Sequence, residues 1–284
     1  MNIQKVGVVG IGLMGSGIAE VCARASYHVI VREINEELRA AGLARIKGSL
    51  DKGVARGKLS PQERDAALSR IQGATDLAEM AGDDLVIEAV TENMEAKSQL
   101  FASLDAICPP HTILATNTSC LSVTQLAAAT KRGAKVLGIH FFNPATVMPL
   151  VELVKTILTS EETLTTAREF AASLGKTTVT APDTPGFIVN RLLIPYLLDA
   201  VRLLQDGVAT REDIDASVKL GLNHPMGPLA LLDFIGLDTC LYIADAMYDE
   251  SKDARYVAPP LLRRLVLAGR YGRKSGRGFY DYPQ

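Results

Sequence analysis

Short apolar runs, each bounded by turn residues, alternate with helix-periodic stretches through the first two thirds of the chain. Apolar runs of this length are typical of buried strands. We therefore expect strands at residues 6–9, 27–32, 84–90, 112–116, 135–142 and 176–181. The periodicity also predicts helices at residues 35–58, 93–107 and 161–174, and two more that open near Ser16 and Ser122. This alternation predicts an α/β fold with a doubly wound parallel sheet.

The strand pattern stops at PDTPG, residues 182–186, which is the clearest boundary in the chain. Beyond it we expect helices only, at residues 187–205 (interrupted by Pro195), 210–220, 229–247 and 261–267. The pattern thus predicts two domains, residues 1–184 and 185–284. Helices of the second domain are apolar on more than one face, which favours burial against a partner chain as well as against the first domain.

Three glycines follow the first strand as G-x-G-x-x-G, at Gly10, Gly12 and Gly15. In a strand–turn–helix frame the first allows a tight turn, the second lets the backbone approach a pyrophosphate, and the third lets helix and strand pack closely. The helix N-terminus then presents free N–H groups to the anion. This context predicts a Rossmann-type dinucleotide site, although a glycine-rich turn without a ligand would have the same spacing.

An acidic residue, Glu33, ends the second strand. A carboxylate at that place accepts hydrogen bonds from the adenosine ribose and repels a 2′-phosphate, so it favours NAD over NADP. Arg32 beside it could offset the preference. Taken alone, Glu33 could equally be a solvated charge that opens the next helix.

Polar residues gather where the later strands end. Glu92 and Lys97 follow the strand at 84–90, and Asn117, Thr118 and Ser119 follow the strand at 112–116. Ligands of open parallel sheets collect at the carboxyl ends of the strands, so these side chains are candidate site residues. They could also serve as helix starts and caps.

His140 lies inside an apolar strand, and Glu152 lies in the next apolar run, LVELV. Asn143-Pro144 and Pro149 bound the segment between them. If the chain reverses there, the carboxylate meets the imidazole, fixes its tautomer and makes it a general base. The alternative is a structural histidine held in the core.

Arg45, Ser49, Lys52 and Arg56 recur at spacings that place them on one face of the helix at 35–58. On the pattern alone a solvated charged face is the preferred interpretation. The alternative is that a phosphate-rich ligand lies along this face.

Composition narrows the function classes. The 284 residues carry a net charge of −2 and are 48% hydrophobic, which gives no general attraction to nucleic acid. We expect no membrane span, no signal peptide and no metal site. The four cysteines show no C-x-x-C spacing and predict buried thiols in a reducing cytoplasm.

Taken together, the chain resembles the L-3-hydroxyacyl-CoA dehydrogenase family, and most closely its short bacterial members, the 3-hydroxybutyryl-CoA dehydrogenases. The resemblance rests on GIGLMGSGIA, LVIEAVTENMEAK, ATNTSCLSVT, GIHFFNPATVMPLVE, TPGFIVNRLL, KLGLNHPMGPLALLDFIGLD and GRKSGRGFYDY. These stretches span nearly the whole chain in the family's order.

The resemblance implies an NAD-binding Rossmann domain, a helical dimerisation domain and a site in the cleft between them. It implies interconversion of (S)-3-hydroxybutyryl-CoA and acetoacetyl-CoA, with His140 as the base and Glu152 as its orienting partner. Ser119 and Asn190 would contact the reacting group. The basic face would hold the CoA phosphates through Ser49, Lys52 and Arg56, with Ser119 a further substrate contact. Cofactor contacts would be Gly10, Ile11, Gly12, Leu13, Met14, Gly15, Glu33, Ala89, Glu92, Lys97, Ser119, Asn143 and Lys274.

Two positions depart from the family. Asp is usual where this chain has Glu33, and Ser is usual where it has Cys120. A nucleophilic role for Cys120 would need a lowered thiol pKa, which no neighbour in sequence provides. Two other functions stay open: a β-hydroxyacid dehydrogenase of the 6-phosphogluconate type, and a non-catalytic NAD-binding or structural protein.

Overall fold

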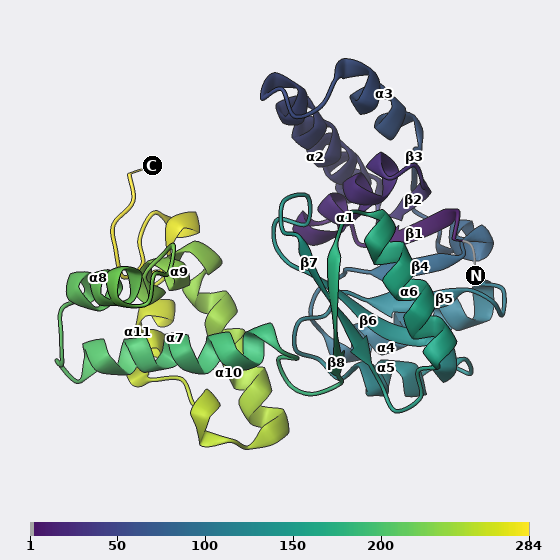
Figure 1. The fold of residues 1–284 in the computed structure, drawn as a ribbon. Coiled ribbons are helices and arrows are strands. Elements are labelled where there is room, and N and C mark those ends of the chain that lie inside the picture. Colours follow the sequence, from purple (N-terminus) through teal and green to yellow (C-terminus); the bar gives the residue numbers. More distant parts are fainter. Residues whose placement is uncertain (1–2, 284) are drawn as a thin grey trace. The chain divides into compact units, whose positions relative to one another are not determined.

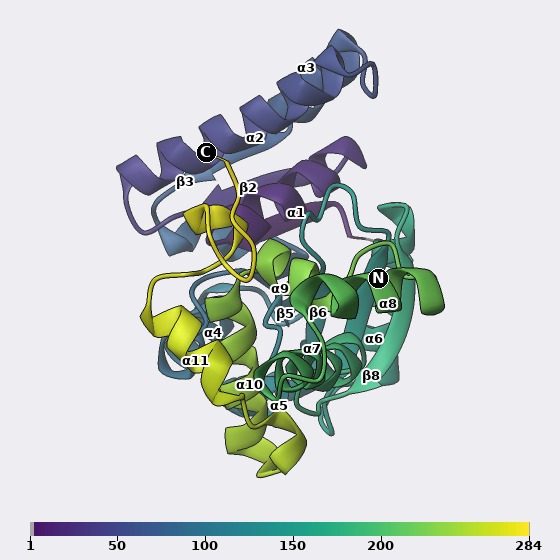
Figure 2. The same ribbon diagram turned by 90° about the vertical axis from the view of Figure 1, so that its left-hand side faces the viewer.

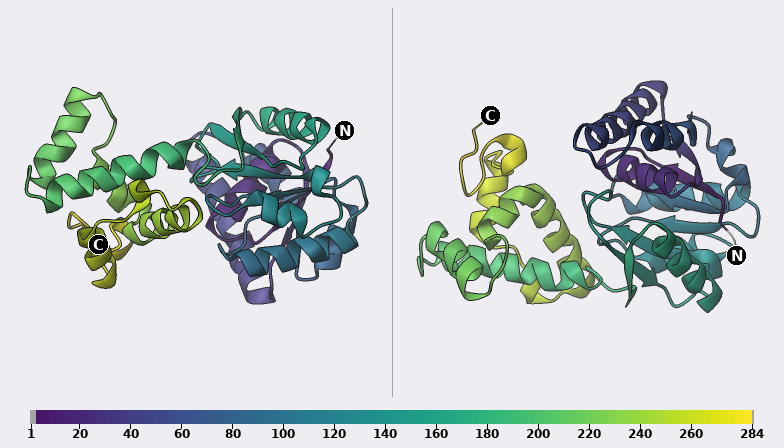
Figure 3. Two further views of the ribbon diagram at one scale, coloured as in Figure 1. Left: turned by 90° about the horizontal axis from the view of Figure 1, so that it is seen from below. Right: turned by 45° about the horizontal axis from the view of Figure 1, so that its top comes forward.

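The structure is a computed structural model that describes residues 3–283. The chain divides into two compact units, Met1–Thr184 and Pro185–Gln284. The first holds the sheet and the second is helical (Figures 1 and 3).

One eight-stranded sheet forms the centre of the first unit, in the order β3-β2-β1-β4-β5-β6-β7-β8 (Figure 1). Its strands are β1 (Lys5–Val9), β2 (His28–Arg32), β3 (Ile71–Ala74), β4 (Leu85–Glu88), β5 (Ile113–Thr116), β6 (Val136–Phe141), β7 (Leu150–Lys155) and β8 (Thr177–Pro182). All neighbouring pairs are parallel except β6 and β7, which run antiparallel. The predicted doubly wound sheet is thus confirmed, with one reversal at β7.

Helices cover both faces of this sheet. Apolar side chains of α1 (Leu13–Arg24), α2 (Glu36–Ala55) and α6 (Glu161–Ser173) form one core with alternate residues of the strands. On the other face lie α4 (Met94–Ile107) and α5 (Val123–Ala128), which pack against each other. The short 3-10 helices are η1 (Leu77–Gly82) and η2 (Gly133–Lys135).

The segment after α2 was not anticipated. The chain forms α3 (Pro61–Ser69) and then the edge strand β3, and Figure 2 shows α2 leading into α3. Ser60 and Glu63 cap α3 reciprocally, a signal that the sequence does carry. The four residues of β3 include a glutamine and a glycine, so they lack the apolar run by which the other strands were found.

The second unit contains α7 (Val189–Gln205), α8 (Arg211–Gly221), α9 (Pro228–Ile235), α10 (Leu237–Ser251), η3 (Ala254–Tyr256), α11 (Pro260–Leu267) and η4 (Arg273–Ser275) (Figure 3). Two predictions were wrong in detail. Pro195 does not interrupt α7, which continues for three further turns beyond it. The predicted helix at 229–247 is two helices, because Gly236 between them has φ +109°, a conformation that ends a helix.

Within residues 3–283, none of the helices combines the length and the apolar character that crossing a bilayer requires.

Candidate active site

The glycine turn between β1 and α1 has the geometry that a dinucleotide needs. Gly10 has φ +87°, and a Cβ at Gly15 would collide with the carbonyl oxygen of Gly10. A Cβ at Gly12 would meet nothing within 4 Å, so this backbone is open to close approach by a ligand. The helix begins at Leu13, three residues earlier than predicted, with Gly12 as its N-cap. These residues therefore fit a bound pyrophosphate.

Glu33 and Arg45 both form hydrogen bonds with the backbone of this turn. Oε1 of Glu33 accepts a hydrogen bond from the Ile11 amide at 2.8 Å, and Arg45 donates to the Ile11 carbonyl at 3.0 Å. Arg45 is thus part of the turn's support, although the sequence placed it with the basic face. Arg32 donates to the Thr75 carbonyl at 3.1 Å.

Other predicted cofactor contacts surround the turn. Ile11 is buried in the core at 1% exposure, so its backbone is the part that a ligand could reach. Leu13 is 66% exposed, while Met14 packs against the core with Ala89. Ala89 follows β4, and its carbonyl lies beside Gly10.

A buried cation between two carboxylates lies at the carboxyl ends of β4 and β5. The ammonium of Lys97 is 2.5 Å from Glu88 and 3.1 Å from Glu92, and Lys97 and Glu88 are almost completely buried. Glu88 also accepts hydrogen bonds from Thr116 Oγ1 at 2.7 Å and from the Val90 amide at 2.7 Å. Buried charges persist only when paired and hydrogen-bonded, and these are.

Glu92 connects this cluster to Ser119. Its Oε1 accepts hydrogen bonds from the Thr118 hydroxyl and from the Ser119 amide, the latter at 3.0 Å. Burial alone would raise the pKa of Glu92, but the charge of Lys97 and these hydrogen bonds outweigh it and lower that pKa. Glu92 therefore stays ionised at neutral pH and holds the Ser119 backbone in place.

Cys120 adjoins the same cluster. Burial, and then the nearby Glu92 carboxylate, raises the pKa of its thiol to about 12. The thiol is therefore protonated at neutral pH, which argues against a nucleophilic role.

His140 and Glu152 are directly opposite each other in the antiparallel pairing of β6 with β7. The chain reversal between Pro144 and Pro149 produces this register. His140 Nδ1 lies 2.8 Å from Glu152 Oε2, and both side chains are buried. With the Nδ1 hydrogen donated to the carboxylate, Nε2 is the basic nitrogen of the ring.

The end of β6 is also fixed to β5, because Asn117 Oδ1 accepts a hydrogen bond from the Phe141 amide at 2.9 Å. Asn143 follows in the exposed turn. It lines a groove on the first unit together with Ser49 and Lys52 of α2.

The structure thus places two of the three predicted phosphate-binding residues in one groove. Arg56 is the C-cap of α2, one turn beyond Lys52, and is exposed. Ser49 adjoins Glu20 of α1: burial raises the pKa of the Glu20 carboxyl, and the nearby Ser49 hydroxyl offsets part of that rise.

Asn190 and Lys274 belong to the second unit. Asn190 lies in the first turn of α7, as predicted, and its side chain is buried. The Lys274 ammonium lies 2.7 Å from the Asp238 carboxylate.

Sequence reasoning missed Glu88, Thr116 and the structural role of Asn117. The available signal was the glutamate that closes the otherwise apolar run LVIE. A carboxylate buried in a strand needs a hydrogen-bonding or charged partner. Lys97, nine residues after Glu88, is that partner.

Comparisons with known proteins identify the same family in both units of the chain. The NAD-binding domain of 3-hydroxyacyl-CoA dehydrogenase matches residues 5–184, and the C-terminal domain of that enzyme matches residues 186–282. A 3-hydroxybutyryl-CoA dehydrogenase of Mycobacterium tuberculosis is 52% identical over 282 residues, which are 99% of each chain. A probable 3-hydroxybutyryl-CoA dehydrogenase of Bacillus subtilis is 48% identical over 284 residues, covering 100% of this chain and 99% of that one.

A solved structure points to the same family. The crystal structure of (S)-3-hydroxybutyryl-CoA dehydrogenase from Ralstonia eutropha is 42% identical, with a TM-score of 0.96 over 100% of both chains. Because the matches cover both units at this identity, the chain belongs to the 3-hydroxyacyl-CoA dehydrogenase family.

Proposed function

We propose that the protein interconverts (S)-3-hydroxybutyryl-CoA and acetoacetyl-CoA, using NAD(H) and a His140–Glu152 acid–base pair. The observation that carries the proposal is the 2.8 Å contact between these two buried side chains at the carboxyl end of the sheet. The relatives named above supply the substrate class.

In the oxidative direction, Nε2 of His140 accepts the proton of the substrate hydroxyl as a hydride leaves C3. In the reductive direction the imidazolium returns a proton to the ketone oxygen. Glu152 holds the ring in this tautomer and stabilises its charged form without taking up a proton itself, as the carboxylate does in a serine-protease triad. Ser119, held by Glu92, positions the substrate oxygen.

The first unit would hold NAD through the glycine turn, with Glu33 at the ribose and the Glu92–Lys97 cluster near the end of β4. When bound, NAD supplies the carbon that donates or accepts the hydride. The CoA phosphates would lie on Ser49, Lys52 and Arg56. Asn190 and Lys274 stay assigned by the family resemblance, to the reacting group and the cofactor respectively.

Oxidation of NADH in the presence of acetoacetyl-CoA tests this function. We expect acetoacetyl-CoA to be reduced efficiently, and free acetoacetate to be reduced far more slowly because it lacks the CoA contacts. A 6-phosphogluconate-type enzyme would instead oxidise a β-hydroxyacid without CoA. Retained NADH binding without turnover of either substrate would favour a non-catalytic protein.

The preference for NAD should depend on the charge of Glu33. Glu33→Gln keeps an oxygen to accept the Ile11 amide hydrogen but removes the negative charge that repels a 2′-phosphate. We expect this change to raise the ratio of kcat/KM for NADPH to that for NADH by about tenfold. Glu37→Ser, an exposed change in the first turn of α2, is the control. Equal use of the two coenzymes by the unmodified protein would contradict the assignment.

We also propose that the protein is a homodimer through its second unit. Large apolar side chains are exposed there, including Leu192 at 72%, Leu220 at 85% and Leu267 at 87%. Exposed apolar side chains that gather into one patch mark protein interfaces. Sedimentation should give twice the mass of the chain, and Leu220→Glu should shift the equilibrium toward monomer. An unmodified protein that stays an active monomer at micromolar concentration would refute the proposal.

The cysteines agree with the proposed cytoplasmic location. Cys22, Cys108, Cys120 and Cys240 are all buried as free thiols. Thiols that stay reduced are typical of proteins in a reducing compartment.

A further inference from the structure

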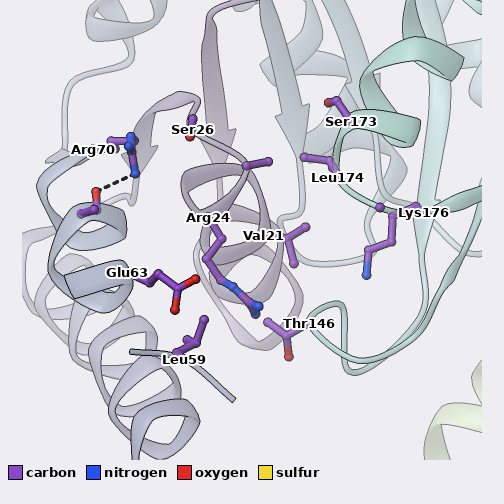
Figure 4. Close-up of a pocket in the computed structure, with 13 residues that line it drawn as sticks. Val21, Arg24, Ser26, Leu59, Glu63, Arg70, Thr146, Ser173, Leu174 and Lys176 are labelled. Atoms are coloured by element: carbon purple, nitrogen blue, oxygen red, sulfur yellow. Dashed lines mark hydrogen bonds between the residues drawn. The ribbon is translucent and has the colours of Figure 1, made fainter. Parts of the chain in front are cut away.

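A second pocket lies at the C-terminal end of α1, between α3 and the turn that joins α6 to β8 (Figure 4). Three cations, Arg24, Arg70 and Lys176, line it together with one carboxylate, Glu63. The Arg24 side chain extends from α1 toward Thr146 (Figure 4). A pocket with net positive charge and several hydrogen-bond donors has the chemistry of a phosphate site.

These cations differ in how many of their hydrogen-bond donors are already engaged by other groups of the protein. Arg70 donates to a backbone carbonyl of α3 at 2.9 Å, and Lys176 donates to two carbonyls of the loop at 143–148, at 2.7 and 2.8 Å. Lys176 retains a third donor, since an ammonium has three. Arg24 reaches Glu20 through one nitrogen at 3.6 Å, and its side chain is 37% exposed. Its guanidinium has five N–H groups, so Arg24 has the most donors left for a ligand.

Arg24 and Lys176, the two cations nearest the loop at 143–148, also repel each other. Burial, and then the charge of Arg24, lowers the pKa of the Lys176 ammonium. An anion bound between them would remove this repulsion, because it would attract both.

The pocket continues the groove that contains Ser49 and Lys52. Thr146 lines both, and α1 forms the floor of both, with Glu20 in the groove and Arg24 one turn further in the pocket. Glu20 is 3% exposed, and one of its carboxylate oxygens has no hydrogen-bond partner among residues 3–283. A ligand amide in the groove would satisfy that oxygen. A ligand lying along α1 would therefore meet the polar Glu20 in the groove first and the cationic Arg24 in the pocket next.

We propose that the Arg24–Lys176 pocket binds the 3′-phosphate of the acyl-CoA, while Lys52 and Arg56 bind its diphosphate. The proposal rests on the acyl-CoA function proposed above. CoA carries a phosphate monoester apart from its diphosphate. The proposal therefore explains why the first unit has two separate cationic sites, the Arg24–Lys176 pocket and the face with Lys52 and Arg56. A monoester has a charge near −2 at neutral pH, which the three cations and single carboxylate of the pocket would balance.

Calorimetric titration with CoA and with 3′-dephospho-CoA tests this assignment. We expect the unmodified protein to bind CoA about three- to tenfold more tightly than 3′-dephospho-CoA, and less so as salt is added. Arg24→Gln should bring this ratio close to one by weakening CoA binding alone, and Arg24→Lys should restore part of it. Lys52→Ala should weaken both ligands alike. Arg168→Gln, on the exposed side of α6, is the matched control and should keep the ratio.

Equal affinity of the unmodified protein for the two ligands would overturn the proposal, as would an Arg24→Gln variant that weakens both equally. Absence of CoA binding would overturn it too. The binding ratio does not depend on turnover, so it is separate from the NADH assay. Tight, 3′-phosphate-dependent CoA binding with no acetoacetyl-CoA reduction would leave the pocket assigned and refute the catalytic function.

Discussion

Replacing His140 with alanine is expected to lower kcat for acetoacetyl-CoA reduction by about 10²–10⁴-fold, the usual cost of losing a positioned acid–base group. His140 is buried on β6 with Glu152 as its partner at 2.8 Å, and the proposed acid–base role rests on this contact. The glycine turn and Glu33 are unchanged in this variant. NADH affinity, measured by fluorescence titration, should therefore stay close to that of the unmodified protein.

Glu152→Gln is expected to lower kcat strongly as well, because it removes the charge that stabilises the imidazolium but keeps the side-chain shape. The two losses should not add, since each substitution disables the same unit. The double variant should then be little slower than His140→Ala alone. Full additivity, or an active His140→Ala enzyme, would show that His140 is a core residue and that another group transfers the proton.

Lys97→Met is expected to reduce the free energy of unfolding by about 3–5 kcal/mol, the usual cost of removing one partner from a buried ion pair. Lys97 is 1% exposed and lies between Glu88 and Glu92, so its loss leaves two carboxylates close together without a cation. Urea denaturation measures the change. Because Glu92 holds the Ser119 amide, KM for NADH should rise in the same variant.

Lys47→Met provides the matched control for Lys97. Lys47 also pairs with a carboxylate, Asp51 at 2.8 Å, but its side chain is 61% exposed. Exposed pairs of this kind contribute less than about 1 kcal/mol. Adding Glu88→Gln to Lys97→Met should recover part of the lost stability. If Lys97→Met were no less stable than Lys47→Met, the buried cluster would not have the structural role assigned to it.

Much of the first unit was predictable because its strands are buried on both faces and read as continuous apolar runs. β3 was missed for the opposite reason: it is a four-residue edge strand with polar positions, and its pairing with β2 positions it. Pro195 shows a different limit. A proline weakens a helix locally, but tertiary packing of α7, whose Ile194 and Leu197 are buried on either side of it, keeps the helix continuous.

In the candidate site, the sequence could predict that His140 and Glu152 meet, because prolines bound the turn between them and the strand pairing follows. It could not predict the partners of Lys97. The nine-residue separation from Glu88 reveals no contact until β4 and α4 are packed together. Arg45 is a similar case, since its bond to the Ile11 carbonyl depends on where α2 lies beside the glycine turn.

Transfer of deuterium from [4,4-²H₂]NADH tests the central claim most directly. The purified protein is incubated with this coenzyme and acetoacetyl-CoA, and the product is analysed by mass spectrometry. The account predicts 3-hydroxybutyryl-CoA with one deuterium at C3, formed by the unmodified protein and, at a rate lower by about 10²–10⁴-fold, by His140→Ala. A product without deuterium at C3, or no product from the unmodified protein, would contradict hydride transfer between NADH and an acyl-CoA at this site.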